Sequence, residues 1–313
     1  MEFPTIKHSI VLISYNQEEF ITRALNSVVN QTILPDEIIV LDDCSIDQTV
    51  ELANKFFSQK PIEISYSVFV NKKNIGIAAN IKKISEVVTG NVISILAADD
   101  ELPNGLVSNI KCAIESSRLD PNKDIFVCFS PLISLDTNGE NPVLQNVNVY
   151  NNSAFETALR KNSSFAKVGF SKGALHEQDY PENLGLWADW AWDVGICAKA
   201  NKYYVIRDIC YTHYRGLGVS SKESESKLNE SYMNAALYIM EKYNERMSVR
   251  DKLFILGEYY YSKYIVNRSK FDFFKSLIFA LVNFFDFRGL VAKKNIAARY
   301  IPDFFIFLVR KIK

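Results

Sequence analysis

The stretch Ile93-Ser-Ile-Leu-Ala-Ala-Asp99-Asp100-Glu101 decides how this sequence is interpreted. An apolar run over residues 92–98 ends abruptly in adjacent carboxylates. The run predicts a buried strand that delivers acids at its C-terminal end, where open α/β sheets bind their ligands. Paired carboxylates there suit a hard divalent cation that also contacts a substrate phosphate. The alternative is that the acids only begin the next helix, where negative charge is favourable.

Apolar segments alternate with segments of helical spacing over the first hundred residues. The predicted strands are 9–13, 37–41, 63–70 and 92–98. The predicted helices between them are 18–30, 47–57 and 78–88. β-branched apolar runs are typical of buried parallel strands, and the alternation predicts right-handed crossovers in one sheet.

Three predicted strand ends carry side chains suited to a nucleotide. Tyr15 follows the first strand, and Asp43 follows the second. Asp99 and Asp100 follow the fourth. An aromatic ring can stack on a base, and a carboxylate can accept from a base or a ribose. No GxGxxG or GxxxxGK[ST] motif occurs, so neither a Rossmann dinucleotide site nor a P-loop is supported.

Several segments in this part of the chain resemble family 2 glycosyltransferases of the GT-A fold. They are Ser9-Ile-Val-Leu-Ile-Ser-Tyr-Asn16, Glu37-Ile-Ile-Val-Leu-Asp-Asp-Cys-Ser45, Asn74-Ile-Gly-Ile-Ala-Ala-Asn80 and Ala98-Asp-Asp100. The resemblance covers residues 8 to about 135, is looser to about 220 and is absent beyond. It implies an α/β fold with an open mixed sheet flanked by helices. The implied glycosyltransferase domain, 1–220, has a donor half at about 1–103 and an acceptor half at about 104–220, and residues 221–313 are expected from their spacing to form a helical, membrane-associating region.

The resemblance also implies roles for individual residues. Tyr15 and Asp43 are expected to hold the nucleobase. Asp99 is expected to contact the ribose or the metal, and Asp100 to bind Mg²⁺ or Mn²⁺ on the diphosphate. Lys83, on the predicted helix before the acids, is expected to face the diphosphate; a solvated helix face is the alternative.

Two positions depart from the family pattern. Many relatives have Asp-x-Asp at the fourth strand end, and Ala97 replaces the first of these acids. The segment 211–220 resembles the family segment that closes over the donor, and Gly218 suits a mobile lid. In one alignment Leu217 occupies the family histidine position; in the other, His213 approaches the metal or diphosphate.

A tryptophan-rich segment contains the candidate general base. All three tryptophans lie between Trp187 and Trp192, around Asp189. Aromatic surroundings can form a sugar platform and can raise a carboxylate pKa by desolvation, as a general base requires. A buried helix start with an early acid is the alternative. Inverting relatives place an acid at a helix start here, which implies Asp189 as the base, with Asp193 as the competing candidate.

Composition excludes some classes of protein. Lys+Arg and Asp+Glu both number 36, so the net charge is zero and a strongly basic nucleic-acid binder is not expected. The five cysteines are widely spaced, which argues against a zinc site or a disulfide framework and for a reducing cytoplasm. No signal peptide pattern and no apolar run of membrane-spanning length occurs.

The last ninety residues are rich in apolar helical pattern. Helical spacing covers 224–244 and 248–266, and strongly apolar segments follow at 271–285 and 300–309 with Lys and Arg on their flanks. Such helices suit peripheral contact with an anionic leaflet on the inner face of the cell membrane. A helical subdomain that packs on the catalytic domain or on a second subunit is the alternative.

The sequence therefore predicts an inverting glycosyltransferase. The expected donor is a nucleoside-diphosphate sugar, with UDP favoured, and the expected acceptor is a saccharide or a polyprenyl-diphosphate-linked saccharide. The expected setting is the assembly of a bacterial surface polysaccharide such as O-antigen or capsule. A sugar-nucleotide nucleotidyltransferase is an alternative, although its Gly-rich basic loop is absent. A non-catalytic carbohydrate-binding protein is another, and it would not need Asp100 and Asp189 together.

Overall fold

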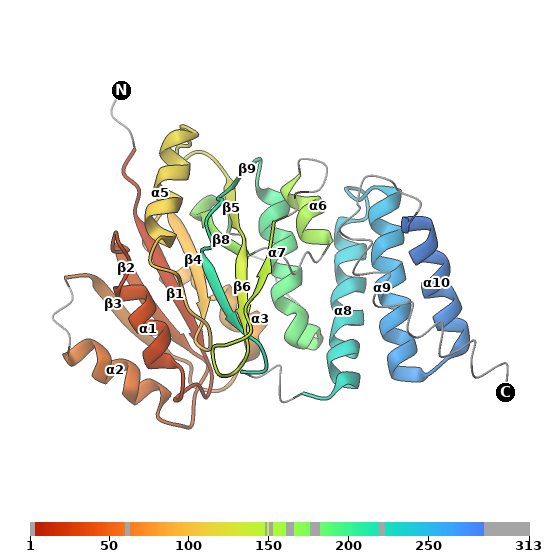
Figure 1. The fold of residues 1–313 in the computed structure, drawn as a ribbon, viewed down its shortest axis with the longest axis horizontal. Helices are drawn as coiled ribbons and strands as arrows, with labels where there is room; N and C mark the ends of the chain where they lie inside the picture. The colour runs from red at the N-terminus through yellow and green to blue at the C-terminus, as the bar shows by residue number, and fades with distance from the viewer. Residues whose placement is uncertain are drawn as a thin grey trace. The chain divides into compact units, whose positions relative to one another are not determined.

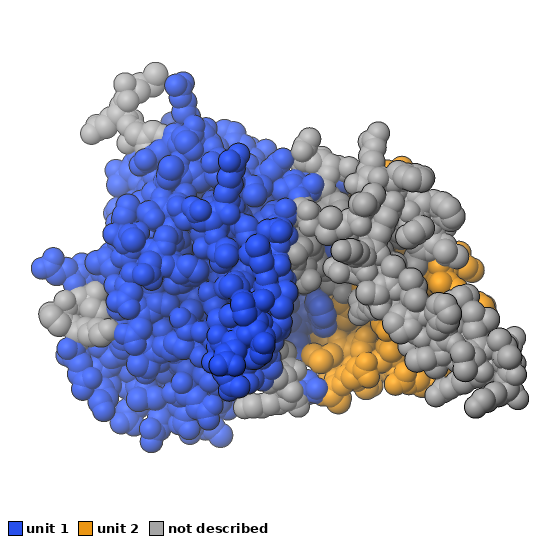
Figure 2. Space-filling view, viewed as in Figure 1, with its two compact units in different colours: residues 1–223 blue, residues 224–313 orange. Residues whose placement is uncertain are grey.

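The computed structural model describes residues 4–59, 63–147, 149, 153–160, 166–175, 182–218 and 223–284. The chain divides into two compact units, residues 1–223 and 224–313. Figure 2 colours these units separately. Each is described by itself below.

A seven-stranded mixed sheet is the centre of the first unit, with strand order β3-β2-β1-β4-β8-β5-β9 (Figure 1). The strands are β1 His8–Ser14, β2 Glu37–Asp42, β3 Ser65–Val70, β4 Val92–Ala97, β5 Phe126–Ser130, β8 Ala166–Ser171 and β9 Lys202–Val205. The first four are mutually parallel, and β8 runs antiparallel to both β4 and β5. The predicted α/β fold with an open mixed sheet is confirmed.

Helices cover the sheet because the alternating strand residues are apolar on both faces. The first five helices are α1 Ile21–Val29, α2 Thr49–Gln59, α3 Gly76–Lys82, α4 Ile84–Val87 and α5 Leu106–Ser116. Leu25 of α1 and Ile110 of α5 join Leu12 of β1 in one buried core cluster. On the acceptor side, Trp192 of α7 (Ala188–Lys199) packs edge-on against Phe170 of β8.

The helix predicted over 78–88 is two short helices that meet at Lys83. Buried Asn80 in the last turn of α3 donates to the backbone oxygen of Leu41, 3.3 Å away. The Lys83 ammonium donates to the side chain of Asn71. These bonds hold the end of α3 against the sheet. A single continuous helix over 78–88 would run away from the sheet at this point.

Strand β8 lies in the middle of the sheet, although residues 140–185 have little periodic pattern. Its sequence includes Lys167 and Gly169, which are unusual in a central strand. A Cβ at Gly169 would lie 2.7 Å from Ile110, so glycine permits α5 to approach the sheet. Lys167 forms a buried ion pair with Asp193. Both features depend on distant partners.

A second, three-stranded sheet of the first unit has the order β10-β6-β7. Its strands are β6 Leu132–Leu135, β7 Val143–Gln145 and β10 Tyr211–Tyr214. The part of 211–220 that was expected to be a lid is therefore partly a strand, parallel to β6. The remaining short elements are α6 Ala154–Leu159, η1 Lys172–Ala174 and η2 Glu182–Trp187.

Three helices make up the described part of the second unit: α8 Glu225–Tyr243, α9 Val249–Asn267 and α10 Lys270–Phe284 (Figure 1). α9 packs against both of the others, and Ser248 and Asp251 form a capping box at its start. Among the described residues, no helix combines the length and hydropathy needed to cross a bilayer. The apolar segment at 300–309 and its flanking basic residues lie outside the described residues.

Candidate functional site

The parallel register brings the predicted strand ends together at one edge of the sheet. Ser14 at the end of β1 pairs with Asp42, and Asp42 pairs with Val70. On the other side of β1, Ile13 pairs with Ala97 at the end of β4. The loops after these strands therefore share one edge, the position at which open α/β sheets bind ligands.

Tyr15 lies on a loop that the second strand end braces. The Asn16 N–H donates to the Ser45 hydroxyl at 2.8 Å, and the Asn16 side chain accepts from the Ile46 N–H at 3.0 Å. Asn16 has a φ of 52°, a conformation that Asn tolerates better than most residues. The half-buried ring of Tyr15 is thus presented from a fixed backbone.

Asp43 is buried and accepts hydrogen bonds from the loop that follows β3. Its Oδ1 accepts from the Asn71 amide at 2.8 Å and from the Ile75 N–H at 2.9 Å. Its Oδ2 accepts from the Gly76 N–H at 2.8 Å, and Gly76 has a φ of +79° that favours glycine. Lys83 donates to the same Asn71, so its ammonium lies at the Asp43 end of the site. The predicted contact of Lys83 with the diphosphate stays a prediction.

Asp100 does not begin a helix, because α5 starts only at Leu106. Its carboxylate is buried and bound from β10: Oδ2 accepts from the Tyr211 hydroxyl at 2.8 Å, and Oδ1 accepts from the Tyr214 N–H at 2.9 Å. Burial, with the adjacent charge of Asp99, raises the pKa of Asp100 to about 7. The interpretation of these acids as a helix start is wrong.

Asp99 differs from its neighbour in how its carboxylate is surrounded. In the part of the chain that the structure describes, no side chain donates a hydrogen bond to it. Burial raises its pKa, which the nearby His213 and Arg23 partly oppose. The backbone of Gly218 lies against it, since a Cβ there would be 2.0 Å from Asp99 Oδ2.

The donor set around these two acids fits a hard divalent cation. Carboxylate oxygens are preferred ligands of Mg²⁺ and Mn²⁺. The pKa values of both acids are raised because neighbouring groups do not fully compensate their negative charge, and a cation would compensate it. Within the described ranges, no group of three or more His, Cys, Asp and Glu could hold a metal alone. A cation at Asp99 and Asp100 therefore needs further oxygens, which a diphosphate and water supply in many magnesium sites.

Asp189 lies in the first turn of α7, and its Oδ1 accepts from the Trp190 N–H at 2.6 Å. The residue is exposed to solvent, although nearby protein atoms partly desolvate its carboxylate. That desolvation, followed by the nearby charge of Asp193, raises the pKa of Asp189 to about 7. Contact with water opposes the rise. A reachable carboxylate with a raised pKa has the properties of a general base.

Asp193, the competing candidate, is held in an ion pair. Its Oδ1 lies 2.9 Å from the ammonium of Lys167, whose side chain is only 5% exposed. That ammonium also lies 4.3 Å from the ring centroid of Trp192. Removing a proton from an acceptor requires a carboxylate that is free to receive it, so this pairing favours Asp189 over Asp193.

Two of the three tryptophans are core residues. Trp190 and Trp192 are buried, and the Trp190 indole N–H donates to the Ala158 backbone oxygen at 2.9 Å. Their rings therefore do not form the expected sugar platform. Trp187, at the start of α7, is half-buried and packs edge-on against Trp190.

Helix α3 links the two halves of the site. It begins at Gly76, whose N–H binds Asp43, and it packs against both η2 and α7. Asp189 lies where η2 passes into α7. The candidate base and the loop around Asp43 are therefore neighbours of the same short helix.

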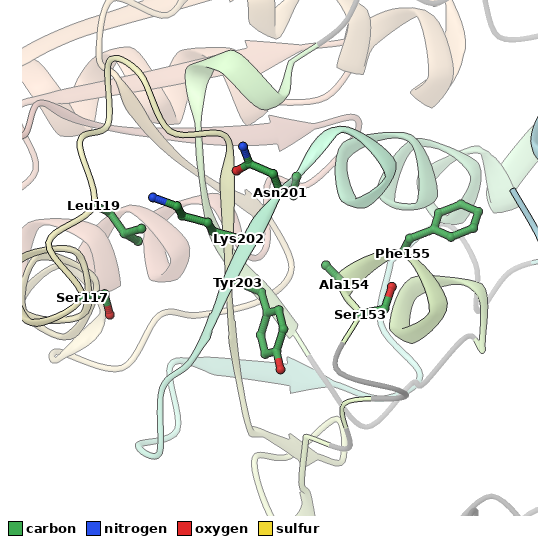
Figure 3. Close-up of a pocket in the computed structure, with 9 residues that line it drawn as sticks. Ser117, Leu119, Ser153, Ala154, Phe155, Asn201, Lys202 and Tyr203 are labelled. Atoms are coloured by element: carbon green, nitrogen blue, oxygen red, sulfur yellow. The ribbon is translucent and has the colours of Figure 1, made fainter.

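A pocket of about 450 Å³ lies elsewhere, between the end of α5, the start of α6 and the start of β9 (Figure 3). Lys202, the first residue of β9, pairs in parallel register with Phe126, the first residue of β5. The pocket is thus at the strand-start edge of the sheet, opposite Asp99 and Asp100. The shape of this pocket alone does not identify it as a catalytic or binding site.

A mixed sheet of this order, with acids gathered at its strand ends, fits the GT-A fold. The chain belongs to Glycosyl transferase family 2, whose family model matches residues 9–175. Both predictions from the resemblance, the family and the transferase class of enzyme, are confirmed.

Relatives of known sequence support the class. The chain is 23% identical over 271 residues to the cholesterol galactosyltransferase of Borreliella burgdorferi, a match that covers 82% of this chain and 74% of that protein. It is 33% identical over 125 residues to an uncharacterized protein of Mycobacterium tuberculosis, covering 40% of this chain. That match spans about a third, 34%, of the mycobacterial protein's length.

Solved structures share the fold. TarS residues 1–349 of S. aureus in complex with UDP-GlcNAc superpose with a TM-score of 0.58 at 18% identity, covering 95% of this chain and 81% of that one. A mannosyltransferase of Pyrobaculum calidifontis in complex with GDP-Man and Mn²⁺ superposes with a TM-score of 0.55 at 13% identity, covering 96% and 84%.

Proposed function

We propose that this protein is an inverting glycosyltransferase that moves a sugar from a nucleoside-diphosphate sugar to a hydroxyl of a saccharide or lipid-linked saccharide. The observation that carries the proposal is the placement of its acids. Asp43, Asp99 and Asp100 gather at one sheet edge. Asp189 is solvent-exposed at the start of α7, and α7 packs on α3, the helix whose first N–H binds Asp43.

The nucleobase binds between Tyr15 and Asp43 in this proposal. Among the described residues, Oδ1 of Asp43 accepts two hydrogen bonds and Oδ2 accepts one, so Oδ2 retains acceptor capacity. An acceptor at this position suits the ring N–H of uracil, thymine or guanine. A UDP-sugar is favoured, in keeping with the UDP-GlcNAc bound to TarS.

Asp99 and Asp100 hold Mg²⁺ or Mn²⁺ with the donor diphosphate. The bound cation supplies neutralisation of the charge that develops on the leaving diphosphate. Asp100 is fixed by β10, whereas no described side chain donates a hydrogen bond to the Asp99 carboxylate. Asp99 is therefore the direct ligand in this proposal, and Asp100 is the weaker or partial one.

Asp189 accepts the proton of the acceptor hydroxyl. The hydroxyl oxygen then attacks the anomeric carbon in line with the bond to the diphosphate, which leaves with both electrons of that bond. A single in-line displacement inverts the anomeric centre, so an α-linked donor gives a β-linked product. Asp193 is kept from this role by its ion pair with Lys167.

The acceptor is proposed to reach the enzyme at the inner face of the cell membrane. Phe271, Phe274 and Ile278 of α10 are 67%, 45% and 58% exposed and follow the i, i+3, i+7 spacing of one helix face. Such a stripe suits shallow insertion beside lipid headgroups. Co-sedimentation with anionic vesicles tests this: the wild type pellets and Phe271→Ser with Phe274→Ser does not. A wild type that stays in the supernatant contradicts it.

A panel of nucleotide sugars, assayed for donor hydrolysis and transfer with Mn²⁺, tests the proposed reaction. The wild type consumes one UDP-sugar preferentially, and EDTA abolishes the reaction. Asp100→Ala and Asp189→Ala both lose transfer. Wild-type transfer by both variants overturns the site assignment, and indifference to EDTA overturns the metal role.

A further inference from the structure

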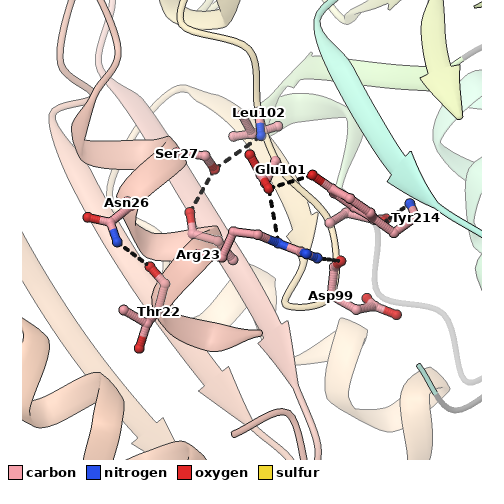
Figure 4. A network of polar contacts seen from close by, with 10 residues as sticks. Thr22, Arg23, Asn26, Ser27, Asp99, Glu101, Leu102 and Tyr214 are labelled. Carbon is pink, nitrogen blue, oxygen red and sulfur yellow. Dashed lines mark hydrogen bonds and ion pairs between the residues drawn. The ribbon is translucent and has the colours of Figure 1, made fainter. Parts of the chain in front are cut away.

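Arg23 of α1 reaches the turn of residues 99–101 that follows strand β4, called the acid turn below. Its Nη2 donates to the Asp99 backbone oxygen at 2.6 Å, and its Nε lies 3.0 Å from Oε1 of Glu101 (Figure 4). Its guanidinium carbon lies 3.8 Å from the ring centroid of Tyr214 in β10. The Arg23 side chain thus contacts Asp99 and Glu101 of the acid turn and Tyr214 of β10.

The groups that Arg23 contacts are also bound to each other. The Tyr214 hydroxyl donates to Glu101 Oε1 at 2.7 Å, and the Tyr214 N–H donates to Asp100 Oδ1 at 2.9 Å. Glu101 and Thr212 exchange backbone hydrogen bonds of 3.1 and 2.9 Å. A single circuit therefore joins α1, the acid turn and β10, with Arg23 as the member that comes from α1.

Geometry rather than charge makes this contact effective. Arg23 and Glu101 are both about a third exposed, at 32% and 30%, and an ion pair of that exposure contributes little stability by itself. The planar guanidinium donates to the Asp99 carbonyl while it pairs with Glu101 and stacks on the Tyr214 ring, and a lysine ammonium cannot match this geometry. The Ser27 hydroxyl, one turn further along α1, accepts from the Leu102 N–H at 3.1 Å and supports the same attachment.

We propose that Arg23 is a positioning residue that fixes Asp99 and Asp100 in the geometry that a divalent cation and a diphosphate need. It acts through the Asp99 carbonyl and through the ring of Tyr214, whose backbone N–H holds Asp100. The identity of the ligand, a divalent cation with a diphosphate, rests on the proposed function. The attachment of the turn to α1 and β10 does not.

The attachment is tested by amide hydrogen exchange, without any ligand. Arg23→Met keeps an unbranched side chain over Tyr214 but removes the donors. The Thr212 and Tyr214 amides are expected to exchange up to about tenfold faster, the loss of one net hydrogen bond, while the amides of β1 and β2 are unchanged. Unchanged exchange in β10 overturns the proposal.

Lys111→Met is the matched control, because Lys111 of α5 forms a 3.7 Å ion pair with Asp36 beside the start of β2. This pair lies at the edge of the sheet opposite the acids. The control is expected to leave the exchange of β10 unchanged. Equal acceleration in both variants means general destabilisation and overturns the role.

Calorimetric titration with UDP and Mn²⁺ tests the consequence. Arg23→Met is expected to weaken Mn²⁺-dependent UDP binding by about 10- to 100-fold, as loss of the outer contacts of a metal site does. Arg23→Lys is expected to recover only a minor part, and full recovery by Lys overturns the geometric role. A wild type that binds no nucleotide with Mn²⁺ contradicts the proposed function, and the exchange experiment still decides whether Arg23 holds the turn.

Discussion

Asp100 and Asp189 both have a carboxyl pKa raised to about 7, but the two acids are held in different ways. Asp100 is buried and accepts from two tyrosine residues of a strand more than a hundred residues away in sequence. Asp189 is exposed, and its carboxylate accepts a local bond from the next residue of its own helix.

The difference matches two different tasks. A group that binds a cation must be held in place before the ligand arrives, and fixed neighbours reduce the cost of ordering it. A group that removes a proton must meet its substrate and exchange the proton with solvent afterwards. The acid turn has the first arrangement, and the start of α7 has the second.

Replacing the base should have the largest effect. Asp189→Asn keeps the shape and the bond from the Trp190 N–H but cannot accept a proton. We expect transfer to fall by about 10²- to 10⁴-fold, the usual contribution of general-base catalysis, with UDP and Mn²⁺ binding unchanged. Steady-state kinetics and calorimetry measure the two effects separately.

Asp193→Asn is the control for this experiment. It leaves the buried Lys167 ammonium without its partner and should lower the free energy of unfolding. Transfer per folded molecule should nevertheless exceed that of Asp189→Asn. The reverse order of activity would assign the base to Asp193.

Removing the Asp99 carboxylate should have the next largest effect. Asp99→Asn is expected to raise the Mn²⁺ concentration for half-maximal UDP binding by about 10- to 100-fold, an effect of the size seen at perturbed metal sites. Because Asp189 is untouched, excess Mn²⁺ should restore much of the transfer rate. A variant with unaltered Mn²⁺ dependence would remove Asp99 from the metal site.

The pH profile distinguishes the two acids further. Asp189 must be deprotonated to act, so with a pKa near 7 the value of kcat/KM should fall about tenfold per pH unit below that pH and level off above it. The profile is recorded at saturating Mn²⁺, so that protonation of Asp100 contributes little. A profile that stays flat down to pH 5 would mean that solvent contact keeps the pKa of Asp189 low.

Loosening the held acid should have the smallest effect. Tyr211→Phe removes the hydroxyl that donates to Asp100 at 2.8 Å and leaves the ring. The loss of one hydrogen bond to a charged group costs about 1.5–3 kcal/mol, and the remaining bond from Tyr214 limits the consequence for Mn²⁺ affinity to about tenfold or less. Loss of Mn²⁺ binding greater than that of Asp99→Asn would make Asp100 the main ligand.

Much of the donor half could be predicted from the sequence. Alternating apolar runs define strands and helices locally, and parallel connection forces the strand ends to one edge. The positions of Tyr15, Asp43 and the acid pair at that edge follow from this pattern. The assignment of Asp189 needed the family resemblance, because its surroundings alone also suited a buried helix start.

Other features could be decided only by the tertiary structure. Strand β8 contains a lysine and a glycine that make sense only beside Asp193 and Ile110. Arg23 looks like any polar residue of a surface helix, and its partner Asp99 lies 76 residues away. The same is true of Tyr211, which is 111 residues from Asp100.

The sequence by itself determined the order of strands and helices in the donor half, and hence the edge where the acids gather. It did so because burial imposes a short-range period on each strand and helix. Only the tertiary structure decided how each acid is held: Asp100 accepts from β10, Asp99 accepts from no described side chain, and Asp193 pairs with Lys167. The physical reason is that a carboxylate's role depends on donors and charges that distant segments bring to it.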